Sequence, residues 1–181
     1  FAAGGKQMPK KDLAMISMTY GNIYVAKVSM ANPGQVVKAM LEADAYDGPS
    51  LIIAYSHCIA HGINMTTAVD GCKEAVTSGY WPLFRFDPRL VAEGKNPLQL
   101  DSKAPTISFE DFAGKQNRFR VLKKNNPEQA DQLLEASAKD FAARFDLYQK
   151  LAELSAEAAD ASVTVRQNLD PEKRAEAGKR L

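Results

Sequence analysis

The chain has 181 residues, 45% hydrophobic and 25% charged, which is long enough and apolar enough to build a domain with a buried core. Its formal net charge of +1 excludes the strong basic field that would steer nucleic acid toward it. No apolar run reaches the about 18 residues of a membrane span, and the opening FAAGGKQMPKK lacks the apolar centre of a signal peptide, which favours the cytoplasm.

A short helix is predicted near the start of the chain. In KDLAMISMTYG, residues 11–21, the side chains of Leu13, Ile16 and Tyr20 share one helical face. Gly21 suits the end of this helix. The residues before it are rich in glycine and lysine and are typical of a loop.

A strand–helix–strand unit is predicted next. IYVAKVSM (23–30) and SLIIAYS (50–56) are β-branched and apolar, as expected of two buried strands. Between them, Asn32 suits the N-cap and Pro33 the first position of a helix. The apolar face of this helix is expected to consist of Val36, Val37, Met40, Leu41 and Ala45. This order predicts parallel strands joined by a right-handed crossover.

The middle of the chain predicts one more helix and one more strand. TTAVDGCKEAVTSG (66–79) has the pattern of an amphipathic helix that ends at Gly79. YWPLFRF (80–86) is typical of an aromatic strand, and Pro82 favours an edge or end position for it. Residues 87–108 are rich in Pro, Asp, Asn and Lys and are expected to be a long surface connection.

A long helix is predicted from Pro127 to about residue 159. Its apolar side chains recur at alternating spacings of four and three, which is typical of a helix face that packs on a core or a neighbour. They are Leu134, Ala138, Phe141, Phe145, Tyr148 and Ala152. The sequence therefore predicts an α/β fold, a parallel sheet flanked by helices, with a long C-terminal helix. Residues 1–108 would form the α/β domain, and residues 109–181 a helical segment and tail.

Cys58 is the residue whose chemistry is least settled by the pattern. It follows the second strand directly, with His57 before it and His61 after it, and ligands of open α/β sheets bind beyond strand carboxyl ends. Zinc needs about four ligands, and this loop offers at most three with no second pair elsewhere. A nucleophilic thiolate would have a histidine as base, but the sequence has no recognisable oxyanion motif or orienting acid.

Two further roles for Cys58 stay open on residue content alone. An inert buried cysteine is the usual role of such a residue. An iron–sulfur ligand is reasonable only if the other three thiolates lie on chain outside this sequence, since a cluster takes about four. The other cysteine, Cys72, is expected to be a helix residue rather than a ligand.

Four long phrases of the chain resemble the C-terminal part of the pyruvate:ferredoxin (flavodoxin) oxidoreductase family. The resemblance runs from Phe1 to about Leu154, and its phrases are KKDLAMISMTYGNIYVAKVSM, EADAYDGPSLIIAYSHCIAHG, SGYWPLFRFDPRL and GKNPLQLDSKAP. The resemblance implies an enzyme that converts pyruvate and coenzyme A to acetyl-CoA and carbon dioxide. It implies that the electrons leave through three 4Fe-4S clusters to ferredoxin or flavodoxin.

The same resemblance implies a role for Cys58 as the fourth ligand of the cluster nearest the thiamine, with the other three ligands upstream. The chain would be the distal part of the domain that binds thiamine diphosphate and Mg2+, whose GDG and NTGGQ-like motifs are absent here. No catalytic residue is therefore assigned in this chain. A start at Phe1, without an initiator methionine, is expected of a piece cut from a longer protein.

The resemblance also implies the partners. They are the upstream remainder of the same polypeptide, ferredoxin or flavodoxin, the substrates pyruvate and coenzyme A, and a second subunit in a homodimer. The chain alone is expected to be inactive. His57 and His61 would either tune the cluster or be ordinary loop residues. A stand-alone structural or interaction module with the same fold, and an oxidoreductase for another 2-oxo acid, remain as alternatives.

Overall fold

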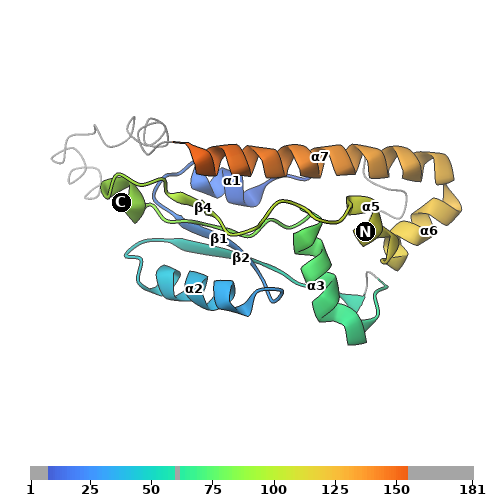
Figure 1. Ribbon diagram of the computed structural model, residues 1–181, viewed down its shortest axis with the longest axis horizontal. Coiled ribbons are helices and arrows are strands. Elements are labelled where there is room, and N and C mark those ends of the chain that lie inside the picture. Colours follow the sequence, from blue (N-terminus) through green and yellow to red (C-terminus); the bar gives the residue numbers. More distant parts are fainter. Residues whose placement is uncertain (1–7, 60–61, 155–181) are drawn as a thin grey trace, which may run out of the picture.

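The computed structural model describes residues 8–59 and 62–154 (Figure 1). The strands are β1 (Tyr24–Ser29), β2 (Ser50–Tyr55), β3 (Phe84–Phe86) and β4 (Leu98–Leu100). The helices are α1 (Leu13–Met18), α2 (Pro33–Asp44), the 3-10 turn η2 (Met65–Thr67), α3 (Ala68–Thr77), α4 (Arg89–Ala92), α5 (Phe109–Gly114), α6 (Asn117–Asn125) and α7 (Pro127–Glu153). The α/β fold with flanking helices and a long C-terminal helix confirms the prediction.

The sheet has the strand order β2-β1-β3-β4 and is mixed. β1 and β2 are parallel, with Tyr24 opposite Ser50, which confirms the predicted strand–helix–strand unit. β3 lies antiparallel to β1, with Val25 opposite Phe86, and β4 lies antiparallel to β3. The strongly parallel character expected from the sequence therefore holds only for the β1–β2 half.

The segment after α3 differs most from the sequence prediction. The aromatic strand begins after Pro82 and covers only Phe84–Phe86, so the proline costs no ladder hydrogen bond and β3 is an interior strand rather than an edge. The prediction of a surface connection over residues 87–108 is wrong, because the segment contains α4 and β4. A strand of three residues is too short to show an alternating pattern among prolines and asparagines.

Side chains of β1 alternate between the two faces of the sheet, as the pleat requires. Tyr24, Ala26 and Val28 face α2 and pack against Ala39. Val25 faces the other side, where α1 and α7 lie (Figure 1). Both faces of β1 are therefore covered, and all six of its residues are buried.

The helix after β1 begins as predicted but presents a different face to the sheet. The Asn32 side chain accepts a hydrogen bond from the Gln35 N–H, and Pro33 is the first helical residue. The residues of α2 that are buried are Gln35 and Ala39, whereas Val37, Met40 and Leu41 of the predicted apolar face are exposed. The shared face predicted for Leu13, Ile16 and Tyr20 in α1 is likewise exposed, and α1 buries Ala14, Ser17 and Met18 instead.

β2 is less buried than the sequence predicted. Its residues range from half-buried to exposed, because β1 is the only strand beside it in the part of the chain that the structure describes. An apolar, β-branched strand of this kind was expected to lie inside a sheet, so the prediction of a buried strand is wrong for this chain.

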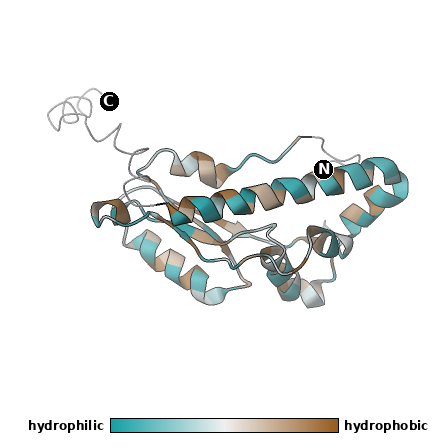
Figure 2. Ribbon diagram, turned by 45° about the horizontal axis from the view of Figure 1, so that its top comes forward, coloured by the Kyte–Doolittle hydropathy of each residue, from teal (hydrophilic) through white to brown (hydrophobic). Residues whose placement is uncertain are grey.

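Helix α7 ties together two separate apolar clusters. Its N-cap Asn126 accepts from the Gln129 N–H. Phe141 packs with α3 and α5 in an aromatic cluster, while Tyr148 packs on the sheet with its ring 4.5 Å from that of Phe84. Figure 2 shows hydrophilic residues along much of α7, interrupted by hydrophobic ones. The predicted stripe is confirmed, and its expected end near residue 159 lies outside the described residues.

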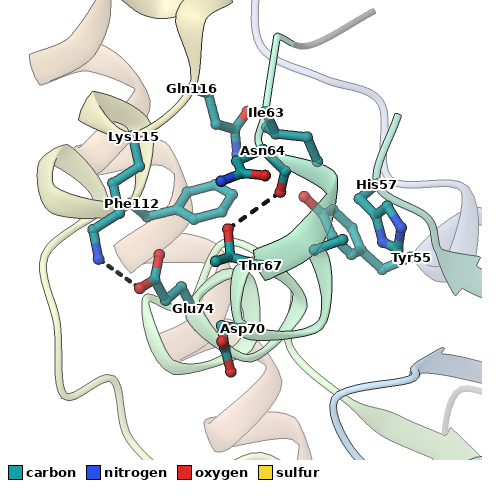
Figure 3. Close-up of a pocket in the computed structure, with 12 residues that line it drawn as sticks. Tyr55, His57, Ile63, Asn64, Thr67, Asp70, Glu74, Phe112, Lys115 and Gln116 are labelled. Atoms are coloured by element: carbon teal, nitrogen blue, oxygen red, sulfur yellow. Dashed lines mark hydrogen bonds and ion pairs between the residues drawn. The ribbon is translucent and has the colours of Figure 1, made fainter. Parts of the chain in front are cut away.

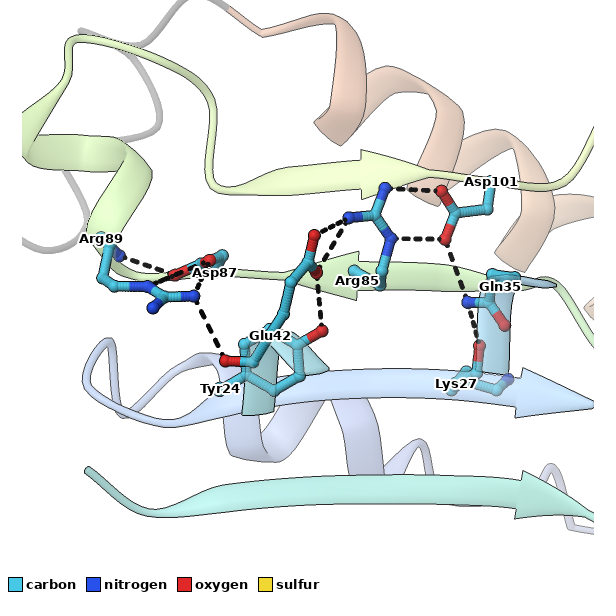
Figure 4. A network of polar contacts seen from close by, with 8 residues as sticks. All are labelled: Tyr24, Lys27, Gln35, Glu42, Arg85, Asp87, Arg89 and Asp101. Atoms are coloured by element: carbon cyan, nitrogen blue, oxygen red, sulfur yellow. Dashed lines mark hydrogen bonds and ion pairs between the residues drawn. The ribbon is translucent and has the colours of Figure 1, made fainter. Parts of the chain in front are cut away.

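A buried network of ion pairs, formed by Arg85, Glu42 and Asp101, connects α2 to the sheet (Figure 4). The Arg85 guanidinium donates two hydrogen bonds to Asp101, both of 2.9 Å, and two to Glu42, of 2.6 and 2.9 Å. Tyr24 donates from its hydroxyl to Glu42 at 2.9 Å, and Gln35 donates to Asp101 at 3.0 Å. Burial alone would lower the pKa of Arg85, but the hydrogen bonds to the two carboxylates raise it overall. The cation therefore stays charged at any physiological pH.

Candidate functional site

The loop after β2 leaves the sheet at the carboxyl end of its two parallel strands. Cys58 comes three residues after Tyr55, the last residue of β2, and its side chain is exposed. This confirms the predicted position at a strand end, where open α/β sheets bind their ligands. The role as a cluster ligand stays a prediction. His61, the other predicted loop histidine, lies outside the described residues.

His57 is positioned by Cys72. The His57 Nδ1 atom lies 3.3 Å from the Cys72 Sγ atom, and Cys72 lies on the buried side of α3. The Cys72 thiol also interacts with the Ser29 hydroxyl at the end of β1. Ser29 at the end of β1, His57 after β2 and Cys72 in α3 therefore meet in one polar contact. His57 directly precedes Cys58 in the sequence.

The two cysteines occupy opposite environments. Cys58 is exposed, whereas Cys72 is only 1% exposed. Burial raises the pKa of the Cys72 thiol, against the opposing effect of hydrogen bonds to Ser29 and His57. Cys72 is therefore protonated at neutral pH and is a poor metal ligand or nucleophile, since the thiolate is the reactive form. Its expected place in a helix is confirmed.

Sequence reasoning missed the contact between His57 and Cys72. The sequence does hold one signal for the helix side of it: Ala68, Cys72 and Ala75 are spaced by four and three, and all three are buried. Nothing in the pattern pairs that face with a residue 15 positions upstream, because the pairing depends on how α3 lies against the strand ends.

Cys58 is the candidate metal ligand of this loop. Within residues 8–59 and 62–154, no three His, Cys, Asp or Glu side chains are grouped so that they could hold a metal ion. A thiolate is the donor that iron–sulfur clusters prefer, and an exposed strand-end loop lets three further thiolates approach from elsewhere. The residue thus fits one corner of a cluster.

A cavity of about 360 Å³ adjoins this loop between α3 and α5 (Figure 3). Tyr55, His57, Asn64, Glu74 and Gln116 are among the residues that line it. Burial raises the pKa of Tyr55, so its hydroxyl is a hydrogen-bond donor or acceptor rather than a base at neutral pH. The cavity therefore places neutral polar groups and the ion pair of Glu74 with Lys115 next to the Cys58 loop.

Lys27 is the other unusual titratable group near the strand ends. It lies on β1 two residues before Ser29, is 6% exposed, and has its Nζ atom 4.2 Å from the centroid of the Trp81 ring. Burial lowers the pKa of Lys27 to about 8. Trp81 in turn donates from its indole N–H to the Val28 carbonyl at 3.0 Å. The aromatic ring therefore covers the lysine and the end of β1 together.

The fold and this loop define an α/β segment with a candidate metal ligand at the carboxyl end of two parallel strands. By sequence, the chain matches pyruvate:ferredoxin and pyruvate-flavodoxin oxidoreductases over 84% of its length, which confirms the resemblance found from its phrases. No protein-family model matches the chain.

Three relatives illustrate the match. The chain is 54% identical over 154 residues to the pyruvate:ferredoxin oxidoreductase of Moorella thermoacetica, and 54% identical over 153 residues to the pyruvate-flavodoxin oxidoreductase of Nostoc sp.. It is 50% identical over 155 residues to the mitochondrial pyruvate dehydrogenase [NADP(+)] of Euglena gracilis. The matched part is 84% of this chain in each case, but only 13%, 13% and 9% of the respective relatives.

One further property of the described residues bears on the class of protein. None of the helices in residues 8–59 and 62–154 combines the length and the apolar character that crossing a membrane requires.

Proposed function

We propose that the chain is a segment of a pyruvate oxidoreductase that forms acetyl-CoA and carbon dioxide from pyruvate and coenzyme A. Its electrons would pass through 4Fe-4S clusters to ferredoxin or flavodoxin. Identity of 54% to relatives with these names supports the reaction class. The observation that carries the assignment to this part of the protein is the exposed Cys58 at the carboxyl end of the β1–β2 pair.

In this proposal Cys58 supplies one thiolate to the cluster nearest the thiamine, and three upstream residues supply the others. The bound cluster would accept the electrons one at a time. Cys58 must be deprotonated to serve as a ligand, and the iron itself enforces this. Cys58 lies only three residues after Tyr55, so the end of β2 would hold this ligand in place.

His57 orients the same loop from the other side. Its Nδ1 atom lies 3.3 Å from the Sγ atom of the buried Cys72, so one ring nitrogen faces the protein interior. A histidine placed in this way would donate or withhold a hydrogen bond near the cluster sulfurs and so tune its potential.

Thiamine diphosphate and Mg2+ would be held by residues outside this chain, and no catalytic residue is assigned within it. The proposed partners are the rest of the polypeptide, ferredoxin or flavodoxin, and a second subunit of a homodimer. The electron acceptors named for the relatives differ, and the Euglena gracilis relative is named for NADP(+).

The test is electron paramagnetic resonance of the dithionite-reduced longer enzyme, comparing the wild type with Cys58→Ser. We expect one 4Fe-4S signal to vanish or change and pyruvate-dependent ferredoxin reduction to fall. Cys72→Ser is the control for loss of a thiol: because Cys72 contacts His57, the substitution should alter a cluster signal at most in shape and should abolish none. Unchanged signals and activity in Cys58→Ser would rule out the ligand role.

A second prediction concerns the 181-residue chain by itself. After anaerobic reconstitution with iron and sulfide it should hold no stable cluster, because one thiolate of about four is too few. It should also bind no thiamine diphosphate and show no pyruvate oxidation. Stoichiometric iron and sulfide on the purified chain, measured by chemical analysis, would contradict this.

A further inference from the structure

In the part of the chain that the structure describes, the outer edge of β2 carries none of the sequence features that usually protect a sheet edge. Its sequence, SLIIAY, has no charge, no proline and no glycine. Natural edge strands usually carry charged residues, prolines or bulges, or lie under other elements, because open backbone groups invite pairing with another strand. β2 pairs with β1 at every position from Ser50 to Tyr55, with no interruption of the register. It has the character of an interior strand.

The backbone groups that this edge exposes can be identified. The Tyr24 N–H donates to the Pro49 carbonyl. In a parallel ladder, hydrogen-bonding groups alternate along each strand. The amides of Leu51 and Ile53 therefore point toward β1, and those of Ile52 and Ala54 point away from it. These two amides and their carbonyls form a ready ladder for one more strand.

The helices on the two faces of the sheet also present apolar residues outward. On α2 these are Val37, Met40 and Leu41, spaced by three and four along one stripe; on α1 they are Leu13 and Ile16. Each of the five side chains is between 49% and 65% exposed. Figure 1 shows α1 and α2 on opposite sides of the β1–β2 pair, so the exposed apolar surface occurs on both sides of the sheet. Large apolar surfaces of this kind mark contacts with other protein.

Helix α7 is a helix of the same molecule whose apolar face is buried. Its apolar residues Phe141, Phe145 and Tyr148 are buried, and exposed ion pairs such as Lys139 with Glu135 lie on its outer side. The sequence patterns of α2 and α7 both predicted one buried apolar face. Within residues 8–59 and 62–154, only α7 of these two helices buries that face.

We infer that β2 is an interior strand of a wider sheet in the longer oxidoreductase. A further parallel strand pairs along its outer edge, and helices joined to that strand cover the apolar residues of α1 and α2. The occupant is another part of the same polypeptide, because the matched region is only 13% of the Moorella thermoacetica relative. The inference rests on the proposed function only in that this chain is a segment of such a protein.

A second copy of the chain fits the surface less well. Two β2 edges related by a two-fold axis perpendicular to the sheet would run antiparallel and would place α2 of both copies on one face, whereas the strand proposed here runs parallel to β2, as β1 does. In a wound α/β sheet, a neighbouring strand has helices on both faces. Such a strand would pair with the backbone groups of β2, and its helices would cover the apolar residues of both α1 and α2.

This arrangement has a consequence for the Cys58 loop. With a strand beyond β2, the loop leaves the sheet between two strand ends instead of at its margin. Crevices between the carboxyl ends of neighbouring strands are where open α/β sheets bind ligands. Residues from the neighbouring segment would then lie within reach of Cys58, as a ligand shared between segments requires.

Hydrogen exchange of the longer holoenzyme, resolved to single amides by mass spectrometry, tests the strand. Leu51 and Ile53 are internal references, because their amides face β1. We expect Ile52 and Ala54 to exchange at rates within about tenfold of those references. Rapid exchange of Ile52 and Ala54 beside slow exchange of the references overturns the inference.

Photo-crosslinking tests the occupant. A photoreactive amino acid replaces Leu41 in the longer enzyme, with Lys139, on the charged side of α7, as the matched control position. We expect a cross-link at Leu41 to another segment of the same polypeptide, at monomer mass and well above the Lys139 control. A cross-link to a second subunit, a cross-link to residues 155–181, or no excess over the control overturns the inference.

The two proposals fail separately. An open β2 edge combined with a lost cluster signal in Cys58→Ser would reject the wider sheet and keep the ligand. A protected β2 edge with unchanged cluster signals would reject the ligand and keep the wider sheet.

Discussion

Replacing Lys27 with methionine should stabilise the chain at neutral pH. Lys27 is 6% exposed on β1, under the ring of Trp81. Burial lowers the pKa of Lys27 from 10.5 to about 8; Asp12 opposes this effect, and Arg144 and Lys10 add to it. The folded protein therefore holds the charged lysine at a cost that the unfolded chain does not have, and methionine fills a similar volume without a charge.

The magnitude follows from proton linkage. Between about pH 8 and 10.5 the unfolded chain binds a proton on Lys27 that the folded chain has released, so the free energy of unfolding rises with pH. A difference of 10.5 against about 8 corresponds to roughly 3 kcal/mol, at about 1.4 kcal/mol for each pKa unit. The cation–π contact with Trp81 returns up to about 2 kcal/mol of this. Lys27→Met should therefore gain about 1–3 kcal/mol at pH 7.

Urea unfolding at pH 7.0 and pH 9.5, followed by fluorescence of the single tryptophan Trp81, measures both quantities. The free energy of unfolding of the wild type should rise by about 2 kcal/mol from pH 7.0 to pH 9.5, and that of Lys27→Met should rise much less. The range stops at pH 9.5 because the pKa values of the buried Tyr24 and Tyr148 are raised, so ionisation of these tyrosines favours the unfolded chain at higher pH. Lys38→Met, at an exposed lysine of α2, is the control and should change stability by less than about 0.5 kcal/mol. A Lys27→Met variant that is less stable at pH 7 with an unchanged pH dependence would refute the reasoning.

Two further substitution pairs can be measured by the same unfolding assay. Arg85→Met should cost about 3–5 kcal/mol, because it leaves two half-buried carboxylates without their cation, whereas loss of the exposed Lys139 should cost at most about 0.5 kcal/mol. Equal effects of the two would show that the Arg85 network adds nothing beyond a surface pair. Gly79→Ala should cost about 1–2 kcal/mol, since Gly79 has a φ of +74° and an added Cβ would lie 2.9 Å from Pro105. Gly71→Ala, inside α3 with open space around it, should instead gain about 0.5–1 kcal/mol, and a loss there would contradict the comparison.

Local signals predicted the parts of the fold that depend on a few neighbouring residues. Asn32 and Pro33 begin α2 because one side chain caps a helix and the other has the right φ, and neither property depends on the rest of the fold. The stripe through Phe141 and Tyr148 likewise predicted the buried face of α7. The direction of β3 could not be predicted, because a run of three residues has the same pattern in either orientation.

Exposure was the harder property to predict. Apolar periodicity in α2 indicates that Val37, Met40 and Leu41 meet protein, but it does not say whether that protein is part of this chain. The same holds for β2, whose sequence is that of a strand with two neighbours. In both cases the pattern indicates that the residues are suited to contact with protein, and it does not say which segment provides that contact.

The sequence predicted the position of the candidate site but not the contacts that hold its loop in place. The strand SLIIAYS is recognisable and Cys58 follows it, so the loop at the carboxyl end of β2 could be inferred. The contact of His57 with Cys72 depends on where α3 settles against the strand ends, and so does the cavity beside them. Contacts between elements that are distant in sequence have no local pattern.

The return of α7 to the start of the chain sets the order in which the protein can fold during synthesis. The Tyr148 hydroxyl donates to the Asp12 carboxylate, 136 residues earlier, at 2.8 Å, and the Tyr148 ring packs on β3. At about 5–20 residues per second, a ribosome needs on the order of ten seconds to make the residues between them. During that time the face of the sheet that α7 later covers is exposed to solvent. A chaperone that binds the nascent chain would find its apolar target there, and would have to leave before α7 could close over it.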